Sequence, residues 1–384
     1  MLKSALSGNV INTPLYSSNN NQSITSLGQI YSGETVVYLD KNIGHIQTKE
    51  IEGIDKYYDE DYHFFDQSEE DDILYSVVDG KKIFRQEHQV NTLLGKIPFY
   101  SGMNVLDYGC AKGTVMKRLM GLKSDVKVHL YDVSRMYENL WSRFIPISQY
   151  CSYQVKSEWV GHFDVVTSFF AFEHTPDPLK ELAIIKGLLK DNGLVYIVVP
   201  NVFENPADFI VADHVHHYSE LSLRYMLAKA GFETIDIDDK VHFAAFVVIA
   251  KKTPHNSIDY IVEAGQLAFV NQAFFDMANR WKNLKNKIRS FEEENLLCHS
   301  AIYGAGVYGN FIATSLQNLG SVVCFIDQNP LLHDTKLFDL DVILPEKLPK
   351  NVEIVYVGLN PKIAKGVMND LIAWAQKDIQ FFYI

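Results

Sequence analysis

Alternating helical and strand patterns begin at about residue 82 and continue to about residue 253. A helical pattern over about 82–96 precedes the apolar run MNVLDYG, and the helical pattern TVMKRLM precedes the run VKVHLYD. Further apolar runs are FDVVTSFF, GLVYIVVP, FETIDI and VHFAAFVVIA, and helical patterns separate all but the last two. This alternation predicts an α/β fold with a mostly parallel sheet covered on both faces. The last two runs follow each other closely, which predicts an antiparallel edge.

One of these helical patterns, SELSLRYMLAKAG, is expected to begin at a serine cap and to end at Gly231. Residues 1 to about 75 differ from this core. They are rich in Asn, Ser and Gly and contain short strand-like runs such as ETVVYL, so we expect a small β-rich module there.

A long helix is predicted over residues 257–297. Its apolar positions are spaced by three and four residues and form a heptad-like seam, which consists of Phe274, Met277, Trp281, Leu284, Ile288 and Phe291. The seam is expected to dock on the protein itself rather than to join two copies. A small α/β unit then begins at SAIYGAGVYGNFIATSL. The predicted division is a β-rich module (1–75), a core (76–253), a helical connector (254–298) and a Rossmann-like unit (299–384).

Composition and charge limit the classes of binding partner that we expect. The 384 residues are 47% apolar and carry a formal net charge of −12, which argues against nucleic-acid binding. The four cysteines are far apart, which indicates neither a cysteine-built zinc ribbon nor a disulfide framework; they are Cys110, Cys151, Cys298 and Cys324. No signal peptide and no apolar run of roughly 18 residues is present. We therefore expect a soluble cytoplasmic protein that binds no membrane, and we leave open whether it is a monomer or a homodimer.

The stretch VLDYGCAKGT (105–114) lies where an apolar strand meets a helix, the edge at which doubly wound sheets bind ligands. Gly109 and Gly113 allow the backbone to come close to a ligand, and the helix offers free N–H groups. Asp132 ends the next strand, where a carboxylate can accept both hydroxyls of a ribose. Because the loop is G-x-x-x-G and not G-x-G-x-x-G, it favours S-adenosylmethionine over a dinucleotide.

This loop resembles the first motif of the class I S-adenosylmethionine-dependent methyltransferases, D-x-G-C-G-x-G. Residues 107–113 match it except that Ala111 replaces the middle glycine. FDVVTSFFAFEHTPDP and MLAKAGFE resemble later segments of the same family. The resemblance implies a Rossmann-like seven-stranded sheet with S-adenosylmethionine as cofactor. It implies cofactor contacts from Asp107, Tyr108, Gly109, Cys110, Gly113, Asp132, Val133 and Phe169.

The whole order of segments resembles the deoxysugar C-methyltransferases, which act on nucleotide-linked 4-keto sugars. That family begins with a zinc ribbon of two C-x-x-C-G pairs, and SALSG (4–8) and DKNIGHIQT (40–48) look like the same frames. The cysteine positions hold Ser4, Ser7, Asp40 and Ile43. Without thiolates a tetrahedral zinc site is implausible, so a metal-free ribbon is expected. The segment YYDEDYHFF (57–65) resembles the family's aromatic segment over the active site, which implies a role for Tyr62.

The C-terminal unit contains a complete G-x-G-x-x-G, formed by Gly304, Gly306 and Gly309, and Asp327 ends the following strand. Taken alone, this pattern predicts a dinucleotide site. Two separate cofactor sites are uncommon, however, and the unit is only half of a full dinucleotide fold. A degenerate fold that holds a sugar nucleotide, or that simply packs, is therefore the preferred interpretation.

Catalytic candidates lie in ADHVHHYS (212–219), after the fifth strand. The sugar-methyltransferase resemblance implies that His214 is the base and that Asp213 orients it, with Tyr218 or Tyr62 as donors. His174, in EHTPDP, is expected first to shape the turn and only second to be catalytic. We predict no metal, because neighbours in an extended segment point to opposite faces. His216 and His217 are expected to be surface or supporting residues.

Together these observations favour a methyltransferase of carbohydrate biosynthesis that methylates carbon in a nucleotide-linked keto sugar. A base would remove a proton next to the ketone, and the methyl would then be transferred in line. The alternatives are an O- or N-methyltransferase on a sugar or other small molecule, an NAD(P)-dependent oxidoreductase that uses the C-terminal G-x-G-x-x-G, and a binding or assembly protein that kept only the fold.

Overall fold

The computed structural model describes residues 2–53, 72, 74–78, 81–329, 332–333, 335–371, 374 and 378–384. The chain forms two compact units, and each combines segments that are distant in sequence. Unit 1 consists of Met1–Thr13, Tyr38–Asn205 and Val215–Asn271, and unit 2 of Pro14–Val37, Pro206–His214 and Gln272–Ile384. In the described part of the chain, no helix is both long and apolar enough to cross a membrane.

Unit 1 is built around a seven-stranded sheet. Its strand order is β10-β9-β8-β11-β12-β15-β14. The strands are β8 (Asn104–Tyr108), β9 (Lys127–Asp132), β10 (Tyr150–Ser152), β11 (Phe163–Phe169), β12 (Leu189–Pro200), β14 (Phe232–Asp238) and β15 (Ala245–Lys252). The first five strands of this order pair in parallel, whereas β15 is antiparallel to both of its neighbours. The predicted mostly parallel sheet with an antiparallel pair at one edge is confirmed.

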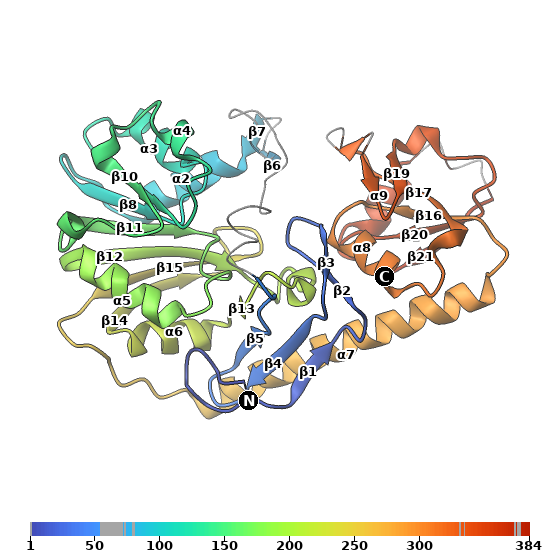
Figure 1. Cartoon of the computed structure of the whole chain (residues 1–384), viewed down its shortest axis with the longest axis horizontal. Helices are drawn as coiled ribbons and strands as arrows, with labels where there is room; N and C mark the ends of the chain where they lie inside the picture. The colour runs from blue at the N-terminus through green and yellow to red at the C-terminus, as the bar shows by residue number, and fades with distance from the viewer. Residues whose placement is uncertain are drawn as a thin grey trace. The chain divides into compact units, whose positions relative to one another are not determined.

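Successive residues of the central strands face opposite layers of helices, as the pleat of a strand requires. Val105 and Val165 belong to one core cluster, whereas Leu106 and Val166, the next residues, belong to the other. In Figure 1 one face of this sheet is covered by α2 (Arg85–Lys96), α3 (Thr114–Leu122) and α4 (Glu138–Trp141). The other face is covered by α5 (Pro178–Leu188) and α6 (Glu220–Lys229).

The start of α6 confirms its predicted serine cap, and α5 also begins at a capping side chain. Asp177 precedes α5 and its side chain accepts the N–H of Lys180 at 3.0 Å, with Pro178 in the first helical position. Ser219 precedes α6 and forms a reciprocal capping box with Ser222. After α6 the chain turns at Gly231, whose φ of +74° is in the left-handed region. These caps fix where the chain leaves the carboxyl edge of the sheet.

Unit 1 also contains β5 (His45–Thr48), the hairpin of β6 (Leu74–Val78) and β7 (Lys81–Phe84), and the short β13 (His216–His217). β13 pairs antiparallel with β5. The two segments that resemble the halves of a zinc ribbon, SALSG (4–8) and DKNIGHIQT (40–48), lie in this same unit. The hydroxyl of Ser7 donates a hydrogen bond to the Asp40 carboxylate, and Ile43 packs in the same core cluster as Leu6. A hydrogen bond thus joins Ser7 and Asp40, two of the positions that would hold cysteines in a zinc ribbon.

The Ser7→Ala variant is expected to lower the free energy of unfolding by about 1–3 kcal/mol, because a carboxylate that is only 1% exposed loses a donor. Denaturant unfolding of the purified variant measures this change. The matched control is Ser17→Ala, which removes a serine–carboxylate bond, to Glu34, from an exposed position. We expect the control to stay within about 0.5 kcal/mol of the native protein. Equal effects of the two substitutions would contradict a structural role for the Ser7–Asp40 pair.

Unit 2 is built around a six-stranded sheet in the order β18-β19-β17-β16-β20-β21. Only the β18–β19 pair among these neighbours is antiparallel. The strands are β16 (Ser300–Tyr303), β17 (Val322–Ile326), β18 (Lys336–Leu337), β19 (Leu340–Ile343), β20 (Ile354–Val357) and β21 (Gln380–Tyr383), with helices α8 (Val307–Ser315) and α9 (Ala364–Asn369). The earlier strands of this unit are β1 (Pro14–Ser17) and the hairpin of β2 (Gln22–Ile24) and β3 (Ile30–Ser32); β4 (Val36–Asp40) begins in it and ends in unit 1.

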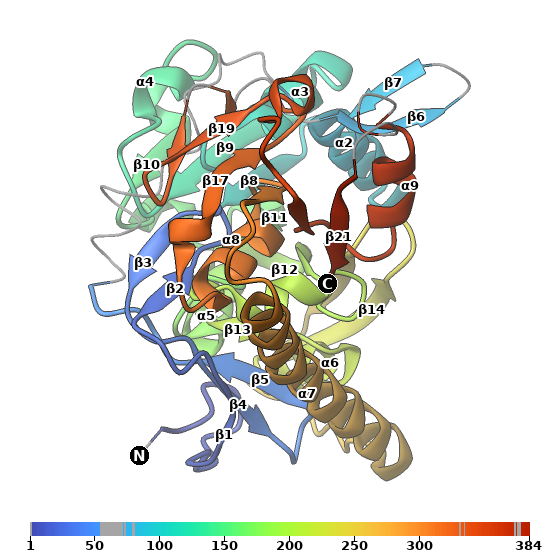
Figure 2. The same cartoon turned by 90° about the vertical axis from the view of Figure 1, so that its right-hand side faces the viewer.

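The predicted long helix is α7 (Ala264–Glu294), drawn as one uninterrupted helix in Figure 2. Within unit 2 its apolar seam packs on the unit's own elements. The Trp281 ring centroid lies 4.6 Å from that of Phe311 in α8, and Phe291 lies 4.8 Å from Phe382 in β21. These contacts agree with the expectation that the seam docks on the protein itself.

Candidate active site

The loop between β8 and α3 has an unusual backbone. Gly109, Ala111 and Gly113 have φ values of +77°, +44° and +68°. A Cβ at Gly109 would lie 2.7 Å from the Ala171 Cβ, and one at Gly113 would lie 2.8 Å from the Leu130 Cδ1. Both glycines are thus required by conformation and by space. Ala111 is the exception, because an L-residue in the left-handed region carries a strain of roughly 1–2 kcal/mol.

Asp132 connects this loop to the end of β9. Its Oδ2 accepts the N–H of Ala111 at 2.8 Å, and its Oδ1 accepts the N–H of Ser134 at 3.1 Å. Burial raises the pKa of this carboxyl. Each carboxylate oxygen can accept a further hydrogen bond, so the group can still receive the two hydroxyls of a ribose. The next residue, Val133, is 56% exposed and flanks this position.

Asp107 lies deeper in the same edge. It is opposite Thr167 of β11 in the parallel register, and the Thr167 hydroxyl donates to its Oδ1 at 2.8 Å. Burial raises the pKa of Asp107 from 3.8 to about 7; the Thr167 hydrogen bond opposes this shift, and the charge of Asp132 adds to it. Asp107 therefore holds a proton over a pH range in which it would be ionised in the unfolded chain.

This shift predicts a pH dependence of stability. The folded-state pKa exceeds the unfolded one, so the free energy of unfolding should fall as pH rises from about 4 to about 7. Asp107→Asn should flatten this slope, by at most about 1.4 kcal/mol per pH unit. Urea unfolding of the cofactor-free protein at several pH values measures it. Asp191→Asn is the control because that side chain is 99% exposed. Parallel curves for native protein and Asp107→Asn would contradict the prediction.

The remaining predicted cofactor residues are divided between the loop and the core. The Tyr108 hydroxyl donates to Glu181 of α5, and its ring lies 4.5 Å from that of Tyr131, so this side chain belongs to the core. Cys110 is also buried, and burial raises the pKa of its thiol. Phe169 is half-buried at the end of β11. The structure thus gathers the loop backbone, Asp132 and Val133 at one edge, whereas the side chain of Tyr108 points elsewhere.

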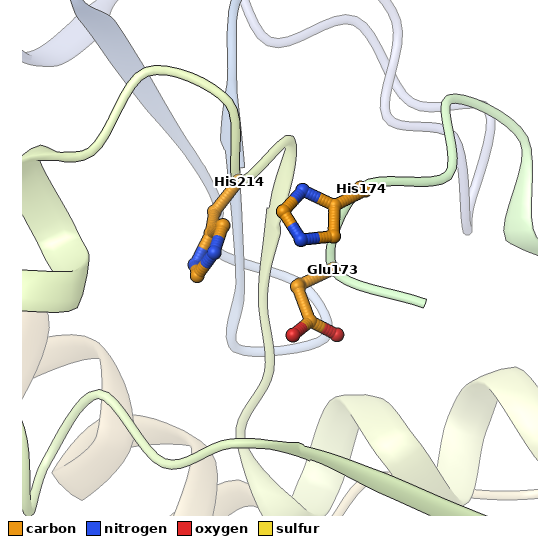
Figure 3. A group of neighbouring side chains, drawn as sticks. All are labelled: Glu173, His174 and His214. Carbon is orange, nitrogen blue, oxygen red and sulfur yellow. The ribbon is translucent and has the colours of Figure 1, made fainter. Parts of the chain in front are cut away.

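Glu173 and His174 are neighbours in the loop between β11 and α5, and both side chains are labelled in Figure 3. The His174 N–H donates to the Ala171 carbonyl at 3.1 Å, and Asp177 caps α5 three residues later. The carbonyl of Glu173 accepts the N–H of His216 at 3.0 Å. The segment EHTPDP therefore shapes the turn and the helix start, as predicted, and a catalytic role for His174 stays a prediction.

His216 and His217 are core residues, so of the two expected placements, at the surface or in a supporting position, the surface one is wrong. Each is 1% exposed. His216 Nδ1 lies 2.9 Å from His45 Nε2, and His217 Nε2 lies 2.9 Å from the Thr48 hydroxyl. Burial lowers the pKa of His216 to about 3, so this imidazole is neutral at neutral pH. The pairing of β13 with β5, which sequence patterns do not reveal, explains the burial.

His214 belongs to unit 2 and is also labelled in Figure 3. Its Nδ1 lies 2.6 Å from the Asp208 Oδ1, and both side chains are buried. Asp213 instead accepts the N–H and the hydroxyl of Ser26 at 2.7 and 2.6 Å. The expectation that Asp213 orients His214 is therefore wrong, because both oxygens of the Asp213 carboxylate accept hydrogen bonds from Ser26. The side chain that orients the His214 ring is instead Asp208, in the short 3-10 helix Pro206–Ile210. In the sequence, the only sign of this pairing is that Asp208 lies six residues before His214.

The two tyrosines predicted as donors are not equivalent. Tyr218 is fully buried, and its hydroxyl already donates to the Phe172 carbonyl at 3.1 Å. This placement contradicts its predicted role as a donor to substrate, because a phenol has one hydrogen to donate. Tyr62 lies outside the described residues.

Two glycines of the C-terminal motif, Gly304 and Gly309, are required by close packing within unit 2. A Cβ on Gly309 would lie 1.8 Å from the Gly304 carbonyl oxygen, and one on Gly304 would lie 2.3 Å from the Gly358 carbonyl oxygen. Asp327 accepts the N–H groups of Ala305 and Asn329, each at 2.8 Å. Close packing alone therefore accounts for Gly304 and Gly309.

Comparison with known proteins gives a family for part of the chain. Residues 84–237 match the model of a methyltransferase domain family. A ubiquinone biosynthesis O-methyltransferase from Acinetobacter baylyi is 28% identical over 145 residues, which are 34% of this chain and 58% of the relative. Its counterpart from Pseudomonas aeruginosa is 26% identical over 144 residues, 35% of this chain and 61% of the relative. The chain thus spans somewhat more than half the length of these curated relatives.

Among solved structures, a methyltransferase from Aquifex aeolicus that depends on S-adenosylmethionine is 23% identical. The likeness covers 43% of this chain and 89% of that one, with a TM-score of 0.36. The 1,6-didemethyltoxoflavin-N1-methyltransferase of Burkholderia thailandensis, solved with S-adenosylhomocysteine, is 19% identical over 44% of this chain and 76% of that one, with a TM-score of 0.33. Residues 84–237 thus match a methyltransferase domain, and the sheet order and the loop described above agree with the predicted class I methyltransferase fold.

Proposed function

We propose that the protein is an enzyme that transfers the methyl group of S-adenosylmethionine to a small molecule. The arrangement of the β8–α3 loop with Asp132 carries this proposal. Gly109, Ala111 and Gly113 have positive φ values in this loop. Asp132 binds the loop at Ala111 and can accept further hydrogen bonds from a ribose. The cofactor supplies an electrophilic methyl on a sulfonium. The protein's part is to align the acceptor with that methyl and to exclude water.

For the acceptor we propose a nucleotide-linked keto sugar that is methylated on carbon. Two observations support this substrate class: the order of segments along the chain, and the hydrogen bond that joins the two ribbon-like segments through Ser7 and Asp40. The buried His214–Asp208 pair supports base-assisted removal of a proton. His214 Nε2 would remove the proton next to the ketone while Asp208 holds Nδ1, which leaves an enolate. A carbon–carbon bond then forms to the methyl, the sulfur–carbon bond breaks, and its electron pair returns to sulfur. The proton on His214 is later released to water.

The second candidate is O-methylation of a small molecule. The observation that favours it is the similarity to the ubiquinone biosynthesis O-methyltransferases, which covers 34% of this chain. In this case the same imidazole would accept the hydroxyl proton as the oxygen–carbon bond forms. The two candidates share the cofactor site and differ in whether a hydrogen on carbon is lost.

Titration calorimetry with S-adenosylmethionine, S-adenosylhomocysteine and NAD(P)H tests the cofactor. We expect the first two to bind; binding of NAD(P)H alone would refute the methyltransferase proposal and support an oxidoreductase. Mass spectrometry of reactions with nucleotide-linked keto sugars in deuterated water then tests the acceptor. Carbon methylation is expected to give a product heavier by one methyl that has lost a hydrogen from the methylated ring carbon, and reversible proton removal should place solvent deuterium in the recovered substrate. A methylated hydroxyl without ring deuterium would favour the second candidate.

A further inference from the structure

We propose that Trp141 is a positioning residue that holds the cofactor loop in its strained conformation and thereby sets cofactor affinity. The proposal rests on the cofactor use proposed above. Trp141 is the last residue of α4 and has no exposed surface. Its indole N–H donates to the Ala111 carbonyl at 2.8 Å.

The peptide units on both sides of the Ala111 Cα are fixed by side chains from one following segment. Trp141 binds the Ala111 carbonyl, and Asp132 binds the Ala111 N–H, each at 2.8 Å. The same indole ring approaches the other end of the loop, because a Cβ on Gly113 would lie 3.3 Å from its Cδ1. Residues 132–141 therefore form a clamp that holds Ala111 from both sides.

The clamp explains how Ala111 can occupy the position of the middle glycine in the motif D-x-G-C-G-x-G. At φ +44° an alanine is disfavoured unless its surroundings hold it there. Without the Trp141 hydrogen bond, we expect the peptide at Ala111 to relax in the cofactor-free protein. Cofactor binding would then have to restore the strained geometry, so the affinity would fall. A glycine at 111 adopts this conformation without strain and should make the Trp141 hydrogen bond dispensable.

The test is a double-mutant cycle on the full chain. It combines Trp141→Phe, which keeps an aromatic ring but removes the N–H, with Ala111→Gly, and calorimetry gives the dissociation constant of S-adenosylmethionine. Trp141→Phe alone is expected to raise that constant by about 5- to 10-fold. In the Ala111→Gly background the same change should raise it by no more than about twofold. Trp159→Phe, which replaces another buried tryptophan of unit 1, should leave the constant unchanged.

The outcomes separate this inference from the proposed function. Absence of binding to the native protein would refute the proposed cofactor. Native binding with an equal effect of Trp141→Phe in both backgrounds would show that Trp141 acts only through packing. If Trp141→Phe does not fold, thermal unfolding of Ala111→Gly tests whether the backbone at Ala111 is strained. A higher midpoint than that of the native protein would support strain at Ala111, and a lower midpoint would overturn it.

Discussion

Replacing His214 by alanine is expected to lower turnover by about 10²- to 10⁴-fold, the usual contribution of a positioned base. The affinity for S-adenosylmethionine should stay within about twofold of the native value, because the residues assigned to the cofactor lie at the ends of β8 and β9. Single-turnover assays at saturating cofactor, with calorimetry in parallel, separate the two quantities. Unchanged turnover would remove His214 from the mechanism.

The neighbouring acids sharpen this test. Asp208→Asn should also lower turnover, because an amide beside His214 Nδ1 stabilises the Nδ1–H tautomer and the protonated imidazole less than a carboxylate does. Asp213→Asn is the matched control, since that carboxylate is hydrogen-bonded to Ser26. We expect Asp213→Asn to affect stability more than turnover. The reverse order of effects on turnover would favour the original expectation that Asp213 orients the base.

Asp132→Asn is expected to weaken binding of S-adenosylmethionine by about 10²-fold, because hydrogen bonds from two ribose hydroxyls to a charged acceptor become bonds to a neutral amide. S-adenosylhomocysteine should lose affinity by the same factor, since both molecules contain the ribose. Calorimetry with each molecule measures the two factors.

The control for this variant is Asp125→Asn, an exposed acid just before the other end of β9, which should bind the cofactor as the native protein does. Thermal unfolding without cofactor shows whether the loop survives in Asp132→Asn. Native affinity in a folded variant would contradict the assignment of Asp132 to the ribose. A loss for S-adenosylmethionine alone would point to the sulfonium instead.

The sheet and its glycine loop could be predicted because local patterns encode them. Alternating apolar runs, the caps at Asp177 and Ser219, and the glycines at 109 and 113 each act over a few residues. The partner of His214 could not be predicted in this way. The choice between Asp208 and Asp213 depends on which direction each side chain takes, and that follows from the contact of Asp213 with Ser26, 187 residues earlier.

Long-range pairing also explains the other corrections. His216 and His217 look like surface residues in a polar stretch, but the pairing of β13 with β5 buries them against His45 and Thr48. Tyr218 likewise loses its predicted role because its hydroxyl meets the Phe172 carbonyl within the core. Such contacts depend on the tertiary fold, which periodicity and composition leave open.

The interleaving of the two units has a consequence for how the chain acquires its structure during synthesis. Unit 2 takes residues 14–37 from the beginning of the chain and residues 272–384 from its end. The Asn310 side-chain amide, for example, donates to the Gly28 carbonyl at 2.6 Å. The N-terminal hairpin emerges from the ribosome long before this partner exists. The hairpin therefore lacks its native contacts while most of unit 1 is translated. During that interval its unpaired strand edges are exposed, and we expect a chaperone to bind the nascent chain there.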